Sequence, residues 1–290
     1  MSWRTVIITK HCKLSVKNGY MCIRDEKLES VHISEIGTLI IDSTMVSVTS
    51  ALLCELIENK VKIVFCDERH LPEAELVPYY GAHNSSKRIR EQISWNEEIK
   101  IKVWTEIVKQ KITNQANLLN KMGLCESDEL YEYVRQTKDG DITNREGFAA
   151  KVYFKALFGH SFRRDMETDV NFGLDYGYSV LLSSFSKEIT KNGYLTQLGI
   201  CHKNEFNFYN LASDLMEPFR VIADELALEL LNSFFDREMK IKMVGLLNKK
   251  VMFAGKEYYL TGAIELYVKS VFNALNNNDI SMLKLYEFPK

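Results

Sequence analysis

The 290-residue chain has few residues that break regular structure, with only 14 glycines and 4 prolines. Together with an aromatic content of 11%, this scarcity argues against disorder, collagen-like repeats and low-complexity sequence. The longest apolar runs fall far short of the ~20 residues that a membrane-spanning helix needs. No basic-then-apolar leader opens the chain, so we expect no secretory signal, no membrane partner and a cytoplasmic location.

Paired cysteine motifs and an excess of charge are also missing. The six cysteines are scattered without a C-x-x-C pair, which indicates neither a zinc site nor a disulfide framework and fits a reducing compartment. The 37 basic residues nearly balance the 39 acidic residues, and the net charge is −2. Nucleic-acid-binding domains usually carry clustered lysine and arginine. Any DNA contact must therefore come from a local patch, from dimer symmetry or from a basic partner.

Two hydrophobic patterns divide the chain near residue 80. Residues 1–80 show short β-branched or alternating runs, a turn at Asn18-Gly19 and one amphipathic helix, as expected of a small β-rich domain. The stretch 67–80 carries Pro72 and Pro78 and is interpreted as the boundary. Residues 81–290 show helical periodicity, with a predicted hairpin at 251–260. The predicted fold class is α+β, a small N-terminal β-rich domain followed by a larger all-α catalytic domain. Helices are expected around 101–112, 148–158, 178–189, 221–235 and 264–275.

The helical half contains two acids three residues apart, Asp214 and Glu217, directly before Pro218. In a helix both carboxylates would share one face, and the proline requires a helix break or start at this point. Carboxylates at a break can point into a cleft. They can equally cap the helix that begins near Phe219, where negative charge is favoured. Both interpretations stay open on spacing alone.

Two further residues are candidates for chemistry, each with a plainer explanation. His202 follows Gly199-Ile200-Cys201 in a turn-like segment, and imidazole is both a metal ligand and an acid–base group. A single surface histidine has the same appearance. Glu146 follows Asn144, a residue suited to capping the next helix, which would place Glu146 in its first turn as a helix-dipole carboxylate.

The best local basic patch is the cluster Lys87, Arg88 and Arg90, which follows a segment rich in aromatic and hydroxyl groups. Such groups at a helix start suit a phosphate backbone, although a solvated helix face gives the same pattern. The pair Arg163 and Arg164 has this ambiguity too. Arg145, beside Glu146, is a further candidate for phosphate contact.

Taken in order, three motifs resemble one family: NFGLDYGY at 171–178, GICH at 199–202 and LASDLMEPFR at 211–220. The first half agrees, through IGTLIIDS at 36–43 and the stretch 61–67. Together they resemble the CRISPR-associated adaptation integrase family, the endonuclease subunit that inserts new spacers, in its type II form. The resemblance covers essentially the whole chain.

The resemblance implies that the chain is a metal-dependent DNA endonuclease and integrase, which attacks a phosphodiester of the CRISPR repeat with a DNA 3′-hydroxyl. It places the metal ligands on Glu146, His202 and Glu217, with Asp214 as a nearby helper. Carboxylate ligands suit Mg²⁺ or Mn²⁺, and an imidazole shifts the preference toward Mn²⁺. The implied partners are prespacer and repeat DNA duplexes, a second copy of the chain, a small ferredoxin-like adaptation subunit and other type II CRISPR proteins. The β-rich domain would make the dimer and partner contacts.

Two other functions remain open at this point. A structure-selective repair nuclease would cut branched DNA with the same metal. A non-catalytic scaffold would only measure and deliver DNA, but it has no physical need for an intact set of metal ligands.

Overall fold

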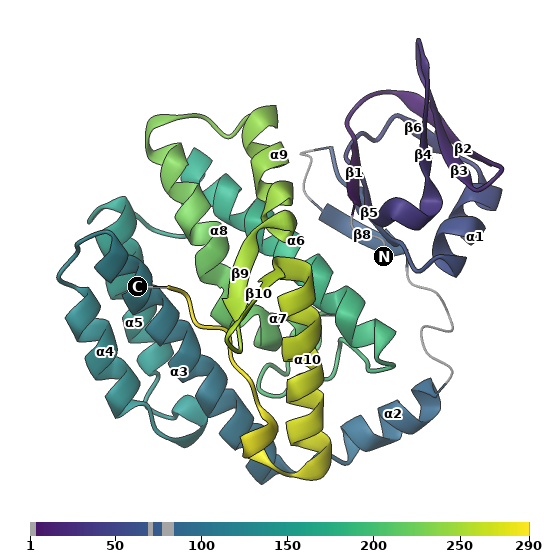
Figure 1. Ribbon diagram of the computed structural model, residues 1–290. Coiled ribbons are helices and arrows are strands. Elements are labelled where there is room, and N and C mark those ends of the chain that lie inside the picture. Colours follow the sequence, from purple (N-terminus) through teal and green to yellow (C-terminus); the bar gives the residue numbers. More distant parts are fainter. Residues whose placement is uncertain (1–3, 69–71, 77–83, 290) are drawn as a thin grey trace. The chain divides into compact units, whose positions relative to one another are not determined.

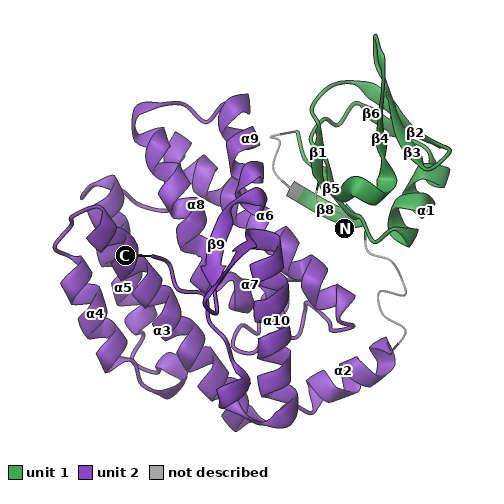
Figure 2. Cartoon of the chain, viewed as in Figure 1, with its two compact units in different colours: residues 1–81 green, residues 82–290 purple. Residues whose placement is uncertain are grey.

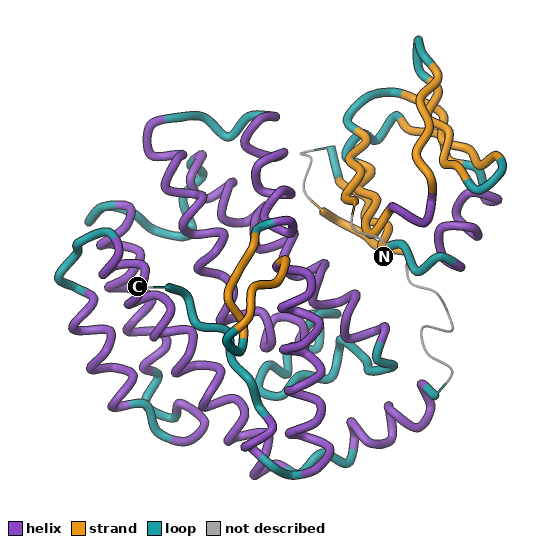
Figure 3. Tube along the Cα trace, viewed as in Figure 1, coloured by secondary structure: helices purple, strands orange, loops and turns teal. Residues whose placement is uncertain are grey.

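The computed structural model describes residues 4–68, 72–76 and 84–289 of a chain that divides into two units, residues 1–81 and 82–290 (Figure 2). The boundary predicted at residue 80 lies outside the described residues. The first unit is built mainly of strands, and the second is mainly helical (Figure 3). The predicted α+β fold class is therefore confirmed.

Two four-stranded sheets form the first unit. One has the order β1-β5-β7-β8, with β1, β5 and β7 parallel and β8 antiparallel to β7. The other has the order β4-β3-β2-β6. The strands are β1 (Arg4–Ile8), β2 (Cys12–Lys17), β3 (Tyr20–Arg24), β4 (Leu28–His32), β5 (Ile36–Ile41), β6 (Val46–Val48), β7 (Lys62–Cys66) and β8 (Pro72–Leu76).

Local sequence explains most of this unit. Asn18 and Gly19 both adopt positive φ, 52° and 76°, which is the conformation that a tight β2–β3 hairpin requires. The Thr49 side chain accepts a hydrogen bond from Leu52 N at 3.4 Å and so caps α1 (Ser50–Glu58). A short 3₁₀ turn, η1 (Ile33–Glu35), precedes β5. The core beneath these elements contains Leu14, Met21, Ile33, Ile36, Leu39, Leu52, Leu56 and Ile63.

Strand β8 differs from the prediction, because it lies within the stretch interpreted as the domain boundary. Its sequence, PEAEL, contains no β-branched residue, and its short alternation of Glu with Ala and Leu begins at a proline, so it carries only a weak strand signal. Backbone pairing with the buried strand β7 stabilises the extended conformation that the β8 sequence does not favour by itself. Pro72 stands at the first position of the strand, where a missing N–H is tolerated.

Nine α-helices of the second unit lie within the described residues. They are α2 (Ser85–Ile93), α3 (Glu97–Lys121), α4 (Ser127–Gln136), α5 (Arg145–Phe158), α6 (Asp169–Lys191), α7 (Asn210–Met216), α8 (Arg220–Ala227), α9 (Arg237–Gly245) and α10 (Leu260–Asn277). The long helix α3 packs against α4, α5, α8 and α10, so it runs through the middle of this unit (Figure 1).

Short elements join these helices. The predicted hairpin is confirmed as β9 (Lys250–Phe253) and β10 (Lys256–Tyr259), which turn at Gly255 with a φ of 78°. The helix expected at 221–235 is wrong beyond Ala227, where η4 (Leu228–Asn232) and a non-helical stretch follow. The other 3₁₀ turns are η2 (Asp139–Asp141), η3 (Glu217–Phe219), η5 (Leu246–Asn248) and η6 (Ile280–Met282).

The last described residues pack into the second unit. Tyr286 and Phe288 are each only 2% exposed, and Tyr286 stacks on Phe219 with ring centroids 4.7 Å apart. Asn114 of α3 donates hydrogen bonds to the carbonyls of Pro218 and Tyr286, at 2.7 and 2.9 Å. This one amide therefore ties α3, the η3 turn and the C-terminal segment together.

Where the structure describes the chain, no helix is both long enough and apolar enough to cross a bilayer.

Candidate active site

Two capping groups fix Glu146 in the first turn of α5. The Asn144 side chain accepts a hydrogen bond from Gly147 N at 3.3 Å, which confirms the predicted cap. The Asp141 carboxylate accepts hydrogen bonds from the N–H groups of Arg145 and Glu146, at 2.8 and 3.0 Å. Because the free N–H groups of the first turn are used in this way, the backbone that carries Glu146 is held firmly.

Glu217 lies at the junction of α7 and α8, where η3 and Pro218 interrupt the helix as predicted. The side chain is only 4% exposed, and its Oε1 lies 2.9 Å from Arg220 Nη2. Burial alone would raise the pKa of Glu217, but Arg220 and Lys111 outweigh it and hold the pKa below its usual value. Glu217 is thus a buried, charged carboxylate.

Asp214 has no exposed surface, and it organises the segment that carries His202. Its Oδ2 accepts hydrogen bonds from the N–H groups of Ile200 and Cys201, at 2.6 and 2.9 Å. Its Oδ1 accepts one from His202 N at 3.2 Å and also pairs with His202 Nδ1. Gly199 is needed here, since a Cβ would lie 2.4 Å from His202 O and 2.8 Å from Asp214 Oδ2.

The pairing with Asp214 defines what His202 can do. With Nδ1 engaged by the carboxylate, Nε2 is the ring atom left for a ligand. The hydrogen bond to Asp214 raises the pKa of His202, and Glu217 and Glu146 add to the rise. The sequence leaves open that Asp214 caps the helix that begins near Phe219. The structure shows that it does not, because α8 has no side-chain cap and both Asp214 oxygens bond to residues 200–202. Its position behind the imidazole fits the predicted helper role.

Lys111 of α3 joins the two glutamates. Its Nζ lies 2.5 Å from Glu146 Oε1 and 2.6 Å from Glu217 Oε2, and only 13% of the lysine side chain is exposed. Burial alone would lower the pKa of Lys111, but the two carboxylates outweigh it and raise the pKa above its usual value. The structure therefore brings Glu146 and Glu217 to one position and places a positive charge between them.

The side chains of the candidate site can be matched to the ligand needs of a divalent cation. Two carboxylates and an imidazole are suitable ligands for Mg²⁺ or Mn²⁺. The buried Glu217 Oε2 has no hydrogen bond of good geometry, although Lys111 lies beside it. In the described part of the chain, no three His, Cys, Asp or Glu side chains already stand at metal-binding distances. The residues thus fit such an ion by chemistry, while Lys111 takes the position between the glutamates.

Helix α3 forms one wall of this candidate site. Besides Lys111 it carries Trp104, whose ring lies 5.7 Å from that of His202 in an edge-to-face arrangement, with an angle of 83° between the ring planes.

Arg145 stands out among the predicted DNA contacts. Its guanidinium lies 5.8 Å from the Tyr133 ring and 5.7 Å from the Phe148 ring. Its Nε is buried without a hydrogen-bond partner among the residues that the structure describes. A cation supported by aromatic rings next to Glu146 is well suited to a phosphate.

The other predicted DNA contacts are spread over the helical unit. Lys87, Arg88 and Arg90 lie on α2, where Glu91 pairs with both Lys87 and Arg88. Arg163 pairs with Asp165 in the segment between α5 and α6. In the same segment, Arg164 pairs with Asp175 and hydrogen-bonds Asn171. The structure does not gather these five basic residues into one patch.

Lys111 and Arg220 are the residues that the sequence analysis missed. Lys111 falls on the apolar face of α3, seven residues after Trp104 and three after Val108, and both of these are buried. A lysine on an apolar face is the signal that would have found it, because buried lysine is almost always paired.

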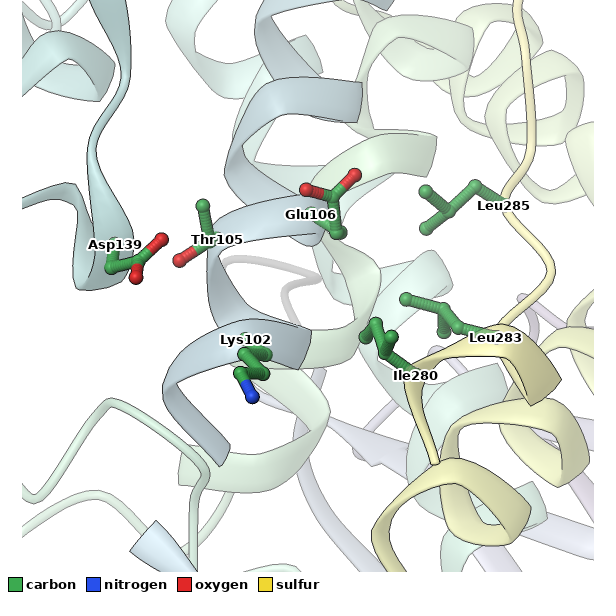
Figure 4. A pocket seen from close by; sticks show the side chains of 7 residues that line it. All are labelled: Lys102, Thr105, Glu106, Asp139, Ile280, Leu283 and Leu285. Carbon is green, nitrogen blue, oxygen red and sulfur yellow. The ribbon is translucent and has the colours of Figure 1, made fainter. Parts of the chain in front are cut away.

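A cavity of about 400 Å³ lies elsewhere in the helical unit (Figure 4). It is lined by Lys102, Thr105 and Glu106 of α3, by Asp139 of η2 and by Ile280, Leu283 and Leu285 of the C-terminal segment. No candidate ligand lines it. The candidate active site is therefore placed at the converging acids and not at this cavity.

Solved structures share this architecture. A casposase bound to an integration product matches 99% of this chain and 93% of its own, with a TM-score of 0.79 and 19% identity. A chain of a Cas6-RT-Cas1–Cas2 complex matches 100% of this chain, with a TM-score of 0.78 and 17% identity; the match spans 36% of that longer chain. At such identities the likeness shows a common fold.

Sequence comparison shows the family. Residues 5–242 match the family model described as CRISPR associated protein Cas1. The CRISPR-associated endonuclease Cas1 of Neisseria meningitidis serogroup C (strain 8013) is 31% identical over 294 residues, which cover 99% of this chain and 97% of that protein. The chain therefore belongs to the Cas1 family, the endonuclease and integrase family of CRISPR adaptation, and the resemblance seen in the sequence is confirmed.

Proposed function

We propose that the chain is a metal-dependent DNA integrase and endonuclease of spacer acquisition. A DNA 3′-hydroxyl would attack a phosphodiester of the CRISPR repeat. Family membership, an endonuclease relative and a fold shared with a casposase bound to an integration product support this proposal. The observation that carries it is the convergence of Glu146 and Glu217 on one cationic position, near enough to the imidazole of His202 for both carboxylates to raise its pKa.

Glu146, Glu217 and His202 Nε2 would hold Mg²⁺ or Mn²⁺. Such an ion, when bound, polarises the phosphoryl group and makes the attacking hydroxyl more acidic. The other steps, orienting the ligands and positioning the substrate, would be carried out by side chains of the protein. Asp214 orients the imidazole, Arg220 holds Glu217 through Oε1, and the Arg145 guanidinium would position a phosphate for in-line attack.

The expected partners follow from the family and remain proposals. They are prespacer and repeat DNA duplexes, a second copy of the chain, a small ferredoxin-like adaptation subunit and other type II CRISPR proteins. The β-rich unit would make the dimer and partner contacts, and the assembly would work in the cytoplasm. The chain's own net charge of −2 fits a DNA platform that is shared among subunits.

The proposal is tested by replacing His202 with alanine and measuring the Mn²⁺-dependent joining of a labelled duplex to a repeat-containing plasmid. Joining should be lost while the circular dichroism spectrum stays that of the wild type. The exposed His160 provides the matched control, and His160→Ala should join DNA normally. Unchanged joining by His202→Ala would refute the assignment.

The same assay separates the two other functions. A repair nuclease would cleave branched duplexes faster than it joins DNA to the plasmid, at matched salt and Mn²⁺. A scaffold would support acquisition even after the site residues are replaced, provided that DNA binding is retained.

A further inference from the structure

Lys111 lies in the interior of the protein, halfway along α3, and reaches toward acids from two other helical segments. Glu146 stands at the start of α5, and Glu217 stands in the η3 turn. The ammonium lies within 2.6 Å of an oxygen on each, although the three residues are far apart in the sequence.

The contacts divide the oxygens of Glu217 between two cations. Arg220 takes Oε1 at 2.9 Å, while Lys111 takes Oε2 without hydrogen-bond geometry. Another cation can therefore replace Lys111 at Oε2 and leave the Arg220 contact intact. The Glu146 N–H is held by Asp141, so the backbone that carries the Glu146 side chain keeps its position when the side-chain partner changes.

Electrostatics favours a cation at this position both before and after the metal binds. Two carboxylates that share one partly buried position repel each other unless positive charge lies between them. A divalent ion and an ammonium group cannot occupy that position together, because both need the same oxygens and because their charges repel.

We propose that Lys111 is an internal counter-ion that holds Glu146 and Glu217 together before the metal binds and leaves that position when the metal arrives. This inference rests on the proposed function. It makes Lys111 a positioning residue that keeps the metal-free protein folded and lowers its affinity for the metal.

The test compares the full-length wild type with Lys111→Met, which keeps the buried alkyl chain and removes the charge. Mn²⁺ dissociation constants are measured by calorimetry and by the electron paramagnetic resonance of free Mn²⁺. Melting temperatures are measured in EDTA and in Mn²⁺. Lys109→Met is the matched control, since Lys109 lies on the same helix and pairs with the more exposed Glu106.

We expect Lys111→Met to bind Mn²⁺ about tenfold more tightly than the wild type, because the competing charge is gone. Its melting temperature in EDTA should fall, and Mn²⁺ should raise it by more than it raises that of the wild type. Lys109→Met should behave like the wild type. If Lys111→Met folds only with Mn²⁺, this dependence supports the proposal. Lys111→Gln, which can still hydrogen-bond, replaces it in the affinity measurement if Lys111→Met folds in neither condition.

Equal or weaker Mn²⁺ binding by the folded charge-free variant would overturn the proposal and leave the metal site standing. Glu217→Gln separates the two inferences, since it should lose Mn²⁺ binding if the site is the metal site. A wild type that binds no Mn²⁺, or a Glu217→Gln variant that binds it equally well, would overturn both the metal site and the role of Lys111.

Discussion

Asp214 shows how a single side chain can organise a site from behind it. Its two oxygens accept hydrogen bonds from three successive backbone N–H groups and pair with the imidazole of His202. Each oxygen meets only donors. An amide at this position would bring its own N–H groups against other N–H groups, whichever way it turned.

Asp214→Asn should therefore lower the free energy of unfolding by about 3 kcal/mol, the cost of replacing charge-assisted hydrogen bonds by a clash of donors. The pKa of His202 should fall, because the hydrogen bond to Asp214 is the largest cause of its rise. Urea denaturation and an NMR titration of the His202 ring measure the two effects. A variant with wild-type stability would contradict the role given to this carboxylate.

Asp224 is a second buried acid, and it gives a prediction about pH. It accepts hydrogen bonds from Tyr153 at 2.8 Å and from Tyr178 at 2.5 Å, but burial outweighs these bonds and raises its pKa to about 6. The folded chain therefore binds this proton more readily than the unfolded chain. Stability begins to fall near pH 4 as the pH rises, and the loss reaches about 3 kcal/mol once the pH lies well above 6.

Asp224→Asn keeps a group of the same shape and removes the titration. The free energy of unfolding of Asp224→Asn, minus that of the wild type, should increase by about 2 kcal/mol between pH 4 and 6.5. Urea denaturation at several pH values measures this difference. A difference that does not change with pH would show that Asp224 titrates normally.

At the scale of one residue, sequence predicts what local contacts decide. The cap at Asn144 and the break at Pro218 follow from neighbours within a few positions. Lys111 escapes prediction because its partner Glu146 lies 35 residues away and its partner Glu217 lies farther still. Only the folded chain shows that these charges meet.

At the scale of helices, two glycines allow α6 to approach its neighbours closely. Gly173 and Gly177 lie one turn apart in the NFGLDYGY motif. A Cβ at Gly177 would lie 2.8 Å from Ala223 Cβ and 3.2 Å from Met243 Sδ, and one at Gly173 would lie 2.2 Å from Leu230 Cδ1. The motif is therefore a packing surface.

Gly177→Ala should lower the free energy of unfolding by about 1 to 3 kcal/mol, because overpacking exceeds the gain in helix propensity. Gly262→Ala is the control, since the nearest atom to its Cβ would be Tyr258 Cβ at 3.9 Å. The free energy of unfolding of Gly262→Ala should rise by up to about 1 kcal/mol, because alanine has the higher helix propensity. Equal effects on urea denaturation would show that α6 can move away from α8.

The C-terminal segment depends on Asn114, which also accepts a hydrogen bond from Phe288 N at 2.9 Å. Asn114→Ala should lower the free energy of unfolding by about 2 to 4 kcal/mol, because buried carbonyl and N–H groups lose their partner. Amide exchange should become faster at residues 286–288. The exposed Asn120 on the same helix is the control, and Asn120→Ala should change neither measurement.

Elements whose own sequence has a clear hydrophobic period or turn signal could be predicted. Elements that depend on contacts with residues far away in the sequence could not. The hairpin β9–β10 and the helices α5, α6 and α10 carry their own signals of turn and amphipathic face. The strand β8 and the C-terminal segment have weak patterns and depend on β7 and on Asn114. Contacts with distant parts of the chain are what give β8 and the C-terminal segment a defined structure.

At the scale of the whole molecule, each unit has its own core. The first is built around residues such as Leu39 and Leu52, and the second around Phe185, Phe219 and Tyr267. All of the candidate ligands belong to residues 82–290. The helical unit therefore contains the complete candidate site.

A fragment of residues 84–290 should consequently fold alone and unfold in one cooperative transition. Its Mn²⁺ affinity should match that of the full chain, because no candidate ligand has been removed. Circular dichroism in urea and calorimetry measure these properties. A fragment without a cooperative transition would show that the first unit is needed for the second to fold.

The contact between Trp104 and His202 has a practical consequence. Indole emission is sensitive to a neighbouring imidazole, and a protonated ring quenches it more strongly than a neutral one. Because these rings lie edge to face, the fluorescence of Trp104 should respond when His202 changes charge or turns toward an ion. Emission from Trp104 is therefore expected to report on the charge of the His202 ring and, if the proposed function holds, on the binding of an ion, without an attached dye.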